Sequence, residues 1–234
     1  MKEHTGIRLM NDLQNLLLPR LCPVCHQRLM PSERFLCMAC TMELPRIDLN
    51  PTDDNAMVRK LWPQVPVEAG TSVIAYRHHS PFHNILVEFK YKGATELALE
   101  MGRWAAWETM PTGLFGQTDV MVPVPLSRRK MRKRGYNQAL LLCKGMREVN
   151  GLPIRNWLRR IKDEDTQTHL NEEERIANTI DAFTADIPRG ERGKHILLID
   201  DVFTTGATMT ACAKAILKAD ETATINVFTL SFSM

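Results

Sequence analysis

The chain has 234 residues, a length that suits one large domain or a medium domain with a small appendage. Charged residues make up 24% and hydrophobic residues 44% of it, which excludes an intrinsically disordered chain and is ample for a buried core. The formal net charge of +3 does not by itself indicate a nucleic-acid partner. No apolar run reaches the roughly 18 residues of a membrane span, and the first residues lack the apolar stretch of a secretory signal. We therefore expect a soluble, cytoplasmic protein.

The N-terminal part of the chain combines a helical pattern with a cysteine cluster. Apolar residues recur at three- and four-residue spacing and predict a short amphipathic helix: Ile7, Met10, Leu13, Leu17 and Leu18. Four of the six cysteines follow as two Cys-x-x-Cys pairs: Cys22, Cys25, Cys37 and Cys40. Each pair directs two thiolates at one metal ion, and two pairs complete the tetrahedron that Zn²⁺ prefers.

Two alternatives to zinc remain for these cysteines. Disulfide bonds are disfavoured because nothing marks the chain as secreted. Iron is the second alternative, since a set of four thiolates does not by itself exclude it. Four thiolates leave the metal no open coordination position, so we expect a structural zinc site, with the neighbouring His26 outside the ligand set.

Prolines, asparagines and aspartates concentrate between Pro45 and Pro66, a composition that predicts a linker. We therefore divide the chain into an N-terminal helix and zinc ribbon over residues 1–50, a linker over 51–70 and a second domain over 71–234. The first and last of these parts are expected to have separate cores. The two remaining cysteines, Cys143 and Cys212, lie on apolar helical faces and are expected to be buried.

Beyond residue 70, apolar strand patterns alternate with helical patterns. Strands are expected at 71–76, 119–124, 195–200 and 223–231, and helices at 81–91, 95–110, 137–149 and 208–218. This alternation predicts an α/β domain with a mostly parallel sheet flanked by helices.

Charge is distributed unevenly within this second domain. Residues 128–162 include twelve basic residues and a single acid, Glu148. Residues 163–191 are predominantly acidic. Six of the seven residues from Arg128 to Arg134 are basic. Such a block cannot be neutralised locally and suits an anionic ligand, the alternative being a solvated loop beside an acidic neighbour.

The stretch from Ile196 to Thr208 carries the most informative pattern. An apolar strand delivers Asp200 and Asp201 to the edge where open α/β sheets place their ligands. A loop of small and hydroxylated residues then runs into a helix: Thr204, Thr205, Gly206, Ala207 and Thr208. Backbone N–H groups and hydroxyls there suit a phosphate, and the carboxylates suit the vicinal hydroxyls of ribose. The pattern predicts a ribose-5-phosphate site, the alternative being a plain turn capped by Thr208.

Taken in order, several motifs resemble one family. The Asp-Asp-x-x-Thr-Thr-Gly-Ala-Thr motif at 200–208 is similar to that of type I phosphoribosyltransferases, which bind 5-phosphoribosyl-1-pyrophosphate (PRPP). Three further motifs, with the paired cysteines, narrow the resemblance to the ComF family: Phe89-Lys-Tyr-Lys-Gly93, Val122-Pro-Val-Pro-Leu-Ser127 and Arg134-Gly-Tyr-Asn-Gln138. The resemblance covers about residues 19–231 and implies a type I phosphoribosyltransferase-like fold. The family is named for a role in natural competence, the uptake of single-stranded DNA.

The resemblance also implies roles for the matched positions. Asp200 and Asp201 would bind the ribose hydroxyls, and the loop from Thr204 to Thr208 would bind the 5-phosphate. A pyrophosphate loop is implied for Val124, Pro125, Leu126 and Ser127, backed by Arg128 and Arg129. Residues 162–171 correspond to a flap that closes over the substrate. A Mg²⁺ ion bridging pyrophosphate and ribose oxygens would reduce the repulsion near the two carboxylates.

The resemblance leaves open whether the chain is an enzyme. Purine-salvage transferases of this fold often carry Asp where this chain has Thr204, which cannot take a proton at neutral pH, so purine salvage is not expected. One remaining function is a transferase that uses PRPP and Mg²⁺ on an unidentified acceptor. The other is a binding module that keeps the sugar-phosphate site and engages single-stranded DNA or a competence helicase. Aromatic rings are sparse around the basic run, with Tyr136 just after it and Trp157 nearby, which favours backbone electrostatics over base stacking.

Overall fold

A four-stranded parallel sheet, in the order β1-β6-β5-β2, organises the computed structural model, which describes residues 19–47, 50–51, 54–76, 80–91, 95–162 and 182–233. Its strands are β1 (Ala69–Tyr76), β2 (Val120–Pro123), β5 (His195–Phe203) and β6 (Thr224–Ser233). The apolar runs of β5 and β6 occupy the two central positions, where a parallel sheet is covered on both faces. The predicted α/β architecture is confirmed.

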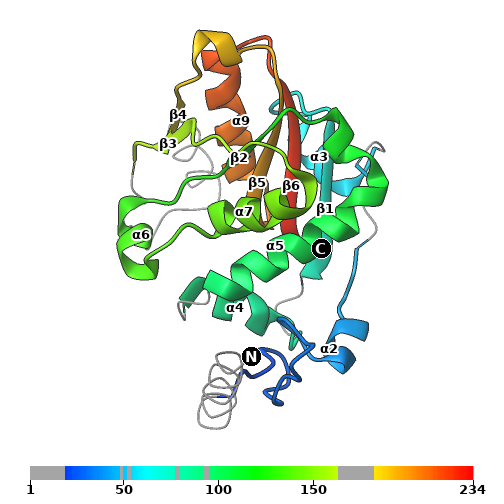
Figure 1. The fold of residues 1–234 in the computed structure, drawn as a ribbon. Helices are drawn as coiled ribbons and strands as arrows, with labels where there is room; N and C mark the ends of the chain where they lie inside the picture. Colours follow the sequence, from blue (N-terminus) through cyan, green and yellow to red (C-terminus); the bar gives the residue numbers. More distant parts are fainter. Residues whose placement is uncertain are drawn as a thin grey trace, which may run out of the picture.

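Helices cover both faces of this sheet (Figure 1). Leu197 and Ile199 of β5 point into one apolar cluster with the helices α4 (His83–Tyr91), α5 (Thr95–Thr109) and α7 (Gln138–Asn150). Ile196 and Leu198 point into the other, with α3 (Ala56–Leu61) and α9 (Ala207–Ala219). The alternation along β5 follows from the two-residue period of a strand. The remaining elements are short: α2 (Met38–Met42), η1 (Met110–Thr112), η2 (Leu114–Gln117), α6 (Arg128–Arg134), β3 (Leu158–Arg160), β4 (Phe183–Ala185) and η3 (Arg189–Glu191).

Each strand and helix expected after residue 70 corresponds to an element of the structure. Strand β5 runs three residues further than expected and ends at Phe203 instead of Asp200. The basic run from Arg128 to Arg134 is the helix α6 and not a loop, and most of this helix is exposed to solvent. Strands β3 and β4 form a separate antiparallel pair that the sequence did not predict.

The segment expected to be a linker contains the buried helix α3. The Asn55 side chain accepts hydrogen bonds from the N–H groups of Met57 and Val58, which caps the helix, and it donates to the carbonyl of Gly70 at 2.7 Å. Met57, Val58 and Leu61 are each no more than 1% exposed. Residues 54–70 therefore pack on the sheet instead of only connecting two domains.

The cysteine-bearing segment shares its core with the sheet domain. Cys22, Leu29, Leu36 and Leu44 belong to the same apolar cluster as α4 and α5, and the segment lies beside these helices in Figure 1. Residues 45–47 also pair with β1: the Ala75 N–H donates to the Pro45 carbonyl at 2.7 Å. The expectation of two separate cores therefore does not match the packing.

Two predictions lie outside the described residues: the amphipathic helix that includes Ile7 and Leu18, and the flap beyond residue 162. Among the helices that the structure describes, none combines the length and apolar composition that a membrane span requires.

Candidate functional site

The carboxyl ends of β2 and β5 lie side by side. Pro123 of β2 is in register with Ile199 of β5, and the N–H of Val124 donates to the Ile199 carbonyl at 2.9 Å. Asp200 is the next residue along β5, so the structure brings the start of the 124–127 loop next to the part of β5 that carries Asp200 and Asp201. These two segments lie far apart in sequence but meet at the edge where open α/β sheets bind ligands.

Asp200 and Asp201 lie within β5, before its last two residues. Both are partly exposed. The Asp200 carboxylate accepts the backbone N–H of Asp201 at 2.8 Å, and Asp200 is in register with Thr229 of β6. Their position on a central strand holds them on rigid backbone, which favours a defined binding geometry.

The loop between β5 and α9 turns at a glycine with a left-handed conformation. Gly206 is the N-cap of α9 at a φ of +85°, and a Cβ there would lie 2.8 Å from the Phe203 ring. As a glycine it offers no side chain to cap α9, and the first turn of the helix holds no acidic residue. Thr204 and Thr205 are exposed, and Thr208 lies inside the helix, so Thr208 is not the cap that the alternative of a plain turn expected. The Ala207 N–H at the start of α9 donates to the Thr205 hydroxyl at 3.4 Å. Backbone N–H groups at a helix start attract a phosphate in general.

Hydrogen bonds at both ends hold the loop of Val124, Pro125, Leu126 and Ser127 in place. Ser127 is 3% exposed and its hydroxyl accepts the N–H of Lys130 at 3.2 Å, which caps α6. The Asn137 side chain donates to the Val124 carbonyl at 3.0 Å and accepts the N–H of Ala139 at the start of α7. The Ser127 hydroxyl therefore orients the basic helix, and Asn137 fixes the loop between β2 and α7.

Helix α6 presents a basic surface directly after this loop. Arg128, Arg129, Arg132 and Lys133 are exposed, and Arg128 and Arg129 begin the helix. Cations at a helix N-terminus oppose the helix dipole, whereas those in the last turn are favoured by it. An anion bound beside Arg128 and Arg129 would relieve that unfavourable interaction.

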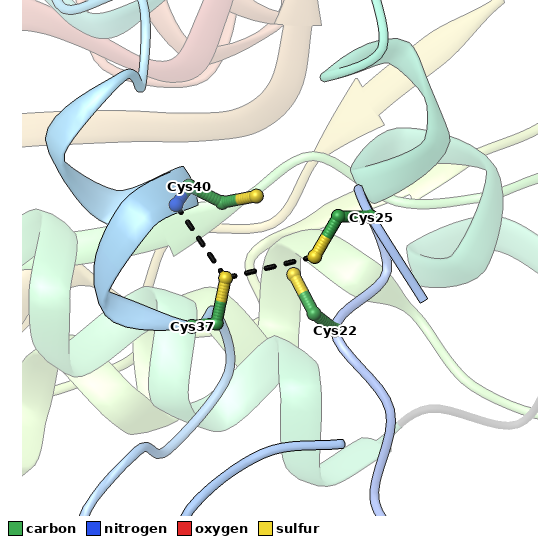
Figure 2. Close-up of side chains that lie close together, drawn as sticks. All are labelled: Cys22, Cys25, Cys37 and Cys40. Atoms are coloured by element: carbon green, nitrogen blue, oxygen red, sulfur yellow. Dashed lines mark hydrogen bonds between the residues drawn. The ribbon is translucent and has the colours of Figure 1, made fainter. Parts of the chain in front are cut away.

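The four cysteines form a compact cluster, shown in Figure 2. Their sulfur atoms all lie within 4.8 Å of one another, and the Cys25 and Cys37 sulfurs are 3.6 Å apart. Four thiolates around one Zn²⁺, at Zn–S distances of about 2.3 Å, have sulfurs about 3.7 Å apart, so the geometry fits a single ion. All six cysteines are among the described residues, and none forms a disulfide bond.

The thiols of the cluster differ in their electrostatics. Burial by itself raises the pKa of Cys22, but backbone hydrogen bonds from Cys37, Cys25 and Val24 outweigh it and lower the pKa to about 7. Burial raises the pKa of Cys40. His26 is exposed, which agrees with its expected place outside the ligand set. Cys143 and Cys212 are buried as predicted, and burial raises the pKa of both thiols.

No family model matches the chain, but curated relatives match it over most of its length. The DNA utilization protein YhgH of Salmonella typhimurium is 28% identical over 92% of this chain and 98% of its own. Competence protein ComFC of Bacillus subtilis is 29% identical over 66% of this chain and 61% of its own. Competence protein F of Haemophilus influenzae is 28% identical over 62% of this chain and 66% of its own. These relatives support the resemblance of the chain to the ComF family.

Solved structures resemble the chain less closely. A hypothetical protein from Neisseria gonorrhoeae with bound ppGpp is 18% identical over 58% of this chain and 68% of that chain, with a TM-score of 0.37. A glutamine PRPP amidotransferase from B. subtilis, complexed with ADP and GMP, is 17% identical over 60% of this chain and 30% of that chain, with a TM-score of 0.39.

The sequence interpretation missed one basic side chain beside the candidate site. The Lys60 ammonium of α3 donates to the Thr204 carbonyl in the β5–α9 loop at 3.4 Å. Helix α3, which carries Lys60, was not predicted because it lies in a segment rich in turn-forming residues. The signal that could have found it is Asn55, a good N-cap, followed by apolar Met57, Val58 and Leu61 at helical spacing.

Proposed function

We propose that this protein binds PRPP, or a related ribose 5-phosphate, together with Mg²⁺ at the carboxyl ends of β5 and β2. One observation carries the proposal: a strand with two partly exposed carboxylates leads within a few residues to a helix start whose N-cap is glycine. The adjacent 124–127 loop, hydrogen-bonded to β5, opens onto the basic helix α6. A PRPP site needs three parts: hydrogen-bond acceptors for the ribose hydroxyls, N–H donors for the 5-phosphate and a cationic surface for the pyrophosphate.

Each part has a separate task in the proposed complex. The Asp200 and Asp201 carboxylates accept hydrogen bonds from the ribose hydroxyls. The loop from Thr204 to Thr208 donates N–H and O–H groups to the 5-phosphate, and Arg128 and Arg129 face the pyrophosphate. Carboxylate oxygens are suitable hard ligands for Mg²⁺, which when bound with PRPP neutralises part of the charge on the pyrophosphate.

The proposed transfer reaction would occur at the anomeric carbon. The bond from that carbon to pyrophosphate breaks, pyrophosphate leaves with the electron pair, and an acceptor nucleophile forms the new bond. Basic side chains near the leaving group stabilise its developing charge. The names of the relatives, DNA utilization and competence proteins, support a role in handling imported DNA.

Addition of PRPP with Mg²⁺ should raise the melting temperature of the protein. A ligand at one hundred times its Kd stabilises the folded state by about 2.7 kcal/mol, which is roughly 5–11 °C for a chain of this size. Thermal-shift measurements with PRPP alone, Mg²⁺ alone and both together check this. An unchanged melting temperature at millimolar PRPP and Mg²⁺ would contradict the proposed site. Pyrophosphate release, measured with and without candidate acceptors, then distinguishes an enzyme from a binding module.

The second candidate function is a sugar-phosphate-responsive module that engages single-stranded DNA or a competence helicase. The observation that favours it is the last turn of α6, which carries Arg132, Lys133 and Arg134 beyond the pyrophosphate loop. Arg132 and Lys133 are exposed. These side chains lie further along the helix than Arg128 and Arg129 and suit a longer polyanion.

Replacing Arg132, Lys133 and Arg134 with alanine should weaken DNA binding without changing the thermal shift that PRPP causes. Each phosphate neutralised in a single strand contributes about 0.7 to the slope of log affinity against log salt, so three lost contacts reduce the slope by about two units. Titration of a labelled oligonucleotide at several salt concentrations measures the slope, with Lys218→Ala on α9 as a control. Salt-insensitive DNA binding, or an equal loss of the PRPP thermal shift, would refute this division between the two ends of α6.

A further inference from the structure

Helix α3 packs against the loop from Thr204 to Thr208, which binds the phosphate in the proposed function. A Cβ added at Gly206 would lie 3.2 Å from the Leu61 side chain, so the end of α3 directly contacts the start of α9. On its other side, Asn55 anchors α3 to β1 through the Gly70 carbonyl. The helix is therefore fixed to both the sheet and the loop.

The Lys60 ammonium is held over this loop by two contacts. It donates to the Thr204 carbonyl at 3.4 Å, and it lies 4.9 Å from the centre of the Phe232 ring at the end of β6. The Phe232 ring in turn stacks on Phe203, with centroids 5.4 Å apart. Both contacts orient a cation, and one lysine N–H group is enough for the carbonyl, which leaves two for an anion.

The charge of Lys60 is not balanced by an acid in the part of the chain that the structure describes. No carboxylate there lies within 4.0 Å of its ammonium. The neighbouring Arg59 is different, because its guanidinium pairs with Asp54 at 2.8 Å. Two adjacent basic residues on one helix thus differ in one respect: Arg59 has a carboxylate partner, whereas Lys60 lies against the phosphate loop.

We propose that Lys60 is a direct ligand of the phosphate bound by the loop from Thr204 to Thr208, and so selects a phosphorylated ribose. This inference rests on the proposed function of that loop. The backbone N–H groups and threonine hydroxyls of the loop are neutral donors, and Lys60 adds a charged one. Charge-assisted hydrogen bonds are about twice as strong as neutral ones, so a phosphate dianion gains more from Lys60 than a neutral sugar does.

Titration of ribose 5-phosphate by calorimetry into the full-length protein tests the proposal. Lys60→Met should weaken binding about tenfold, the loss expected for one hydrogen bond to a charged group. Lys60→Arg should restore most of the affinity, because it keeps a donor and the charge. Arg59→Met, the matched control, should bind like the wild type. The Lys60→Met loss should also shrink at high salt, where the ionic contribution is screened.

The wild-type titration distinguishes a failure of the proposed sugar-phosphate site from a failure of the proposed role of Lys60. Absence of binding to the wild type would overturn the proposed sugar-phosphate site and this inference with it. Normal wild-type binding with unchanged affinity in Lys60→Met would overturn only the role of Lys60. Melting temperatures of the unliganded variants within a few degrees of the wild type show that a loss of affinity is not a loss of folding.

Discussion

Replacing Cys37 with serine should release the bound metal and lower the melting temperature of the whole protein. The hydroxyl of serine is a poor zinc ligand at neutral pH, and the three remaining thiolates do not complete the tetrahedron. Loss of a structural metal is among the largest single-site effects, about 4 kcal/mol or more, which is roughly 10 °C for a chain of this size. Elemental analysis of zinc and iron together with calorimetry measures both consequences.

The melting temperature should fall for the α/β part as well as for the cysteine module, because the two share one core. Cys22, Leu29 and Leu36 lie in the same apolar cluster as Phe89 and Met101. Two resolved transitions, with the α/β part melting at its wild-type temperature, would contradict this coupling. The control is His26→Asn: His26 is exposed at a φ of +57°, which asparagine tolerates, so this variant should keep its metal. Wild-type protein that contains neither zinc nor iron would contradict the metal site itself.

The parts of the fold that the sequence predicted are those with strong periodicity. The apolar run of β5 and the amphipathic pattern of α7 each led to an element within a few residues of the observed bounds. The end of β5 was placed too early because two charged residues ordinarily mark a strand end. Pairing with β6 continues through Asp200 to Phe203, since neighbouring strands supply hydrogen bonds regardless of side-chain polarity.

Helices α3 and α6 were missed for different reasons. Helix α6 has almost no apolar residue, so periodicity gives no signal, and its ends are set by Ser127 and by Gly135 at a φ of +81°. Helix α3 is apolar on its buried side but is only a few residues long and lies among prolines and aspartates. The Lys60 contact depends on tertiary packing across 144 residues of sequence, which no local pattern contains.

The joint replacement of Asp200 and Asp201 with asparagine should nearly abolish the PRPP thermal shift. Each carboxylate accepts a hydrogen bond from a ribose hydroxyl in the proposed complex, and a hydrogen bond to a charged group is worth about 1.5–3 kcal/mol. Two such losses weaken binding roughly a hundredfold or more. At a PRPP concentration one hundred times the wild-type Kd, the stabilisation then falls from about 2.7 to about 0.4 kcal/mol, a shift of roughly 1 °C.

The melting temperature of the unliganded variant, measured beside that of the wild type, distinguishes a lost site from a damaged fold. Asparagine removes both charges at nearly constant shape. After the Asp200→Asn change, the side-chain carbonyl oxygen can still accept the backbone N–H of residue 201, which the Asp200 carboxylate accepts at 2.8 Å. Asp54→Asn with Asp186→Asn removes two exposed charges elsewhere and should leave the PRPP shift intact. A full shift in the Asp200→Asn, Asp201→Asn protein would show that the ribose hydroxyls are bound by other groups.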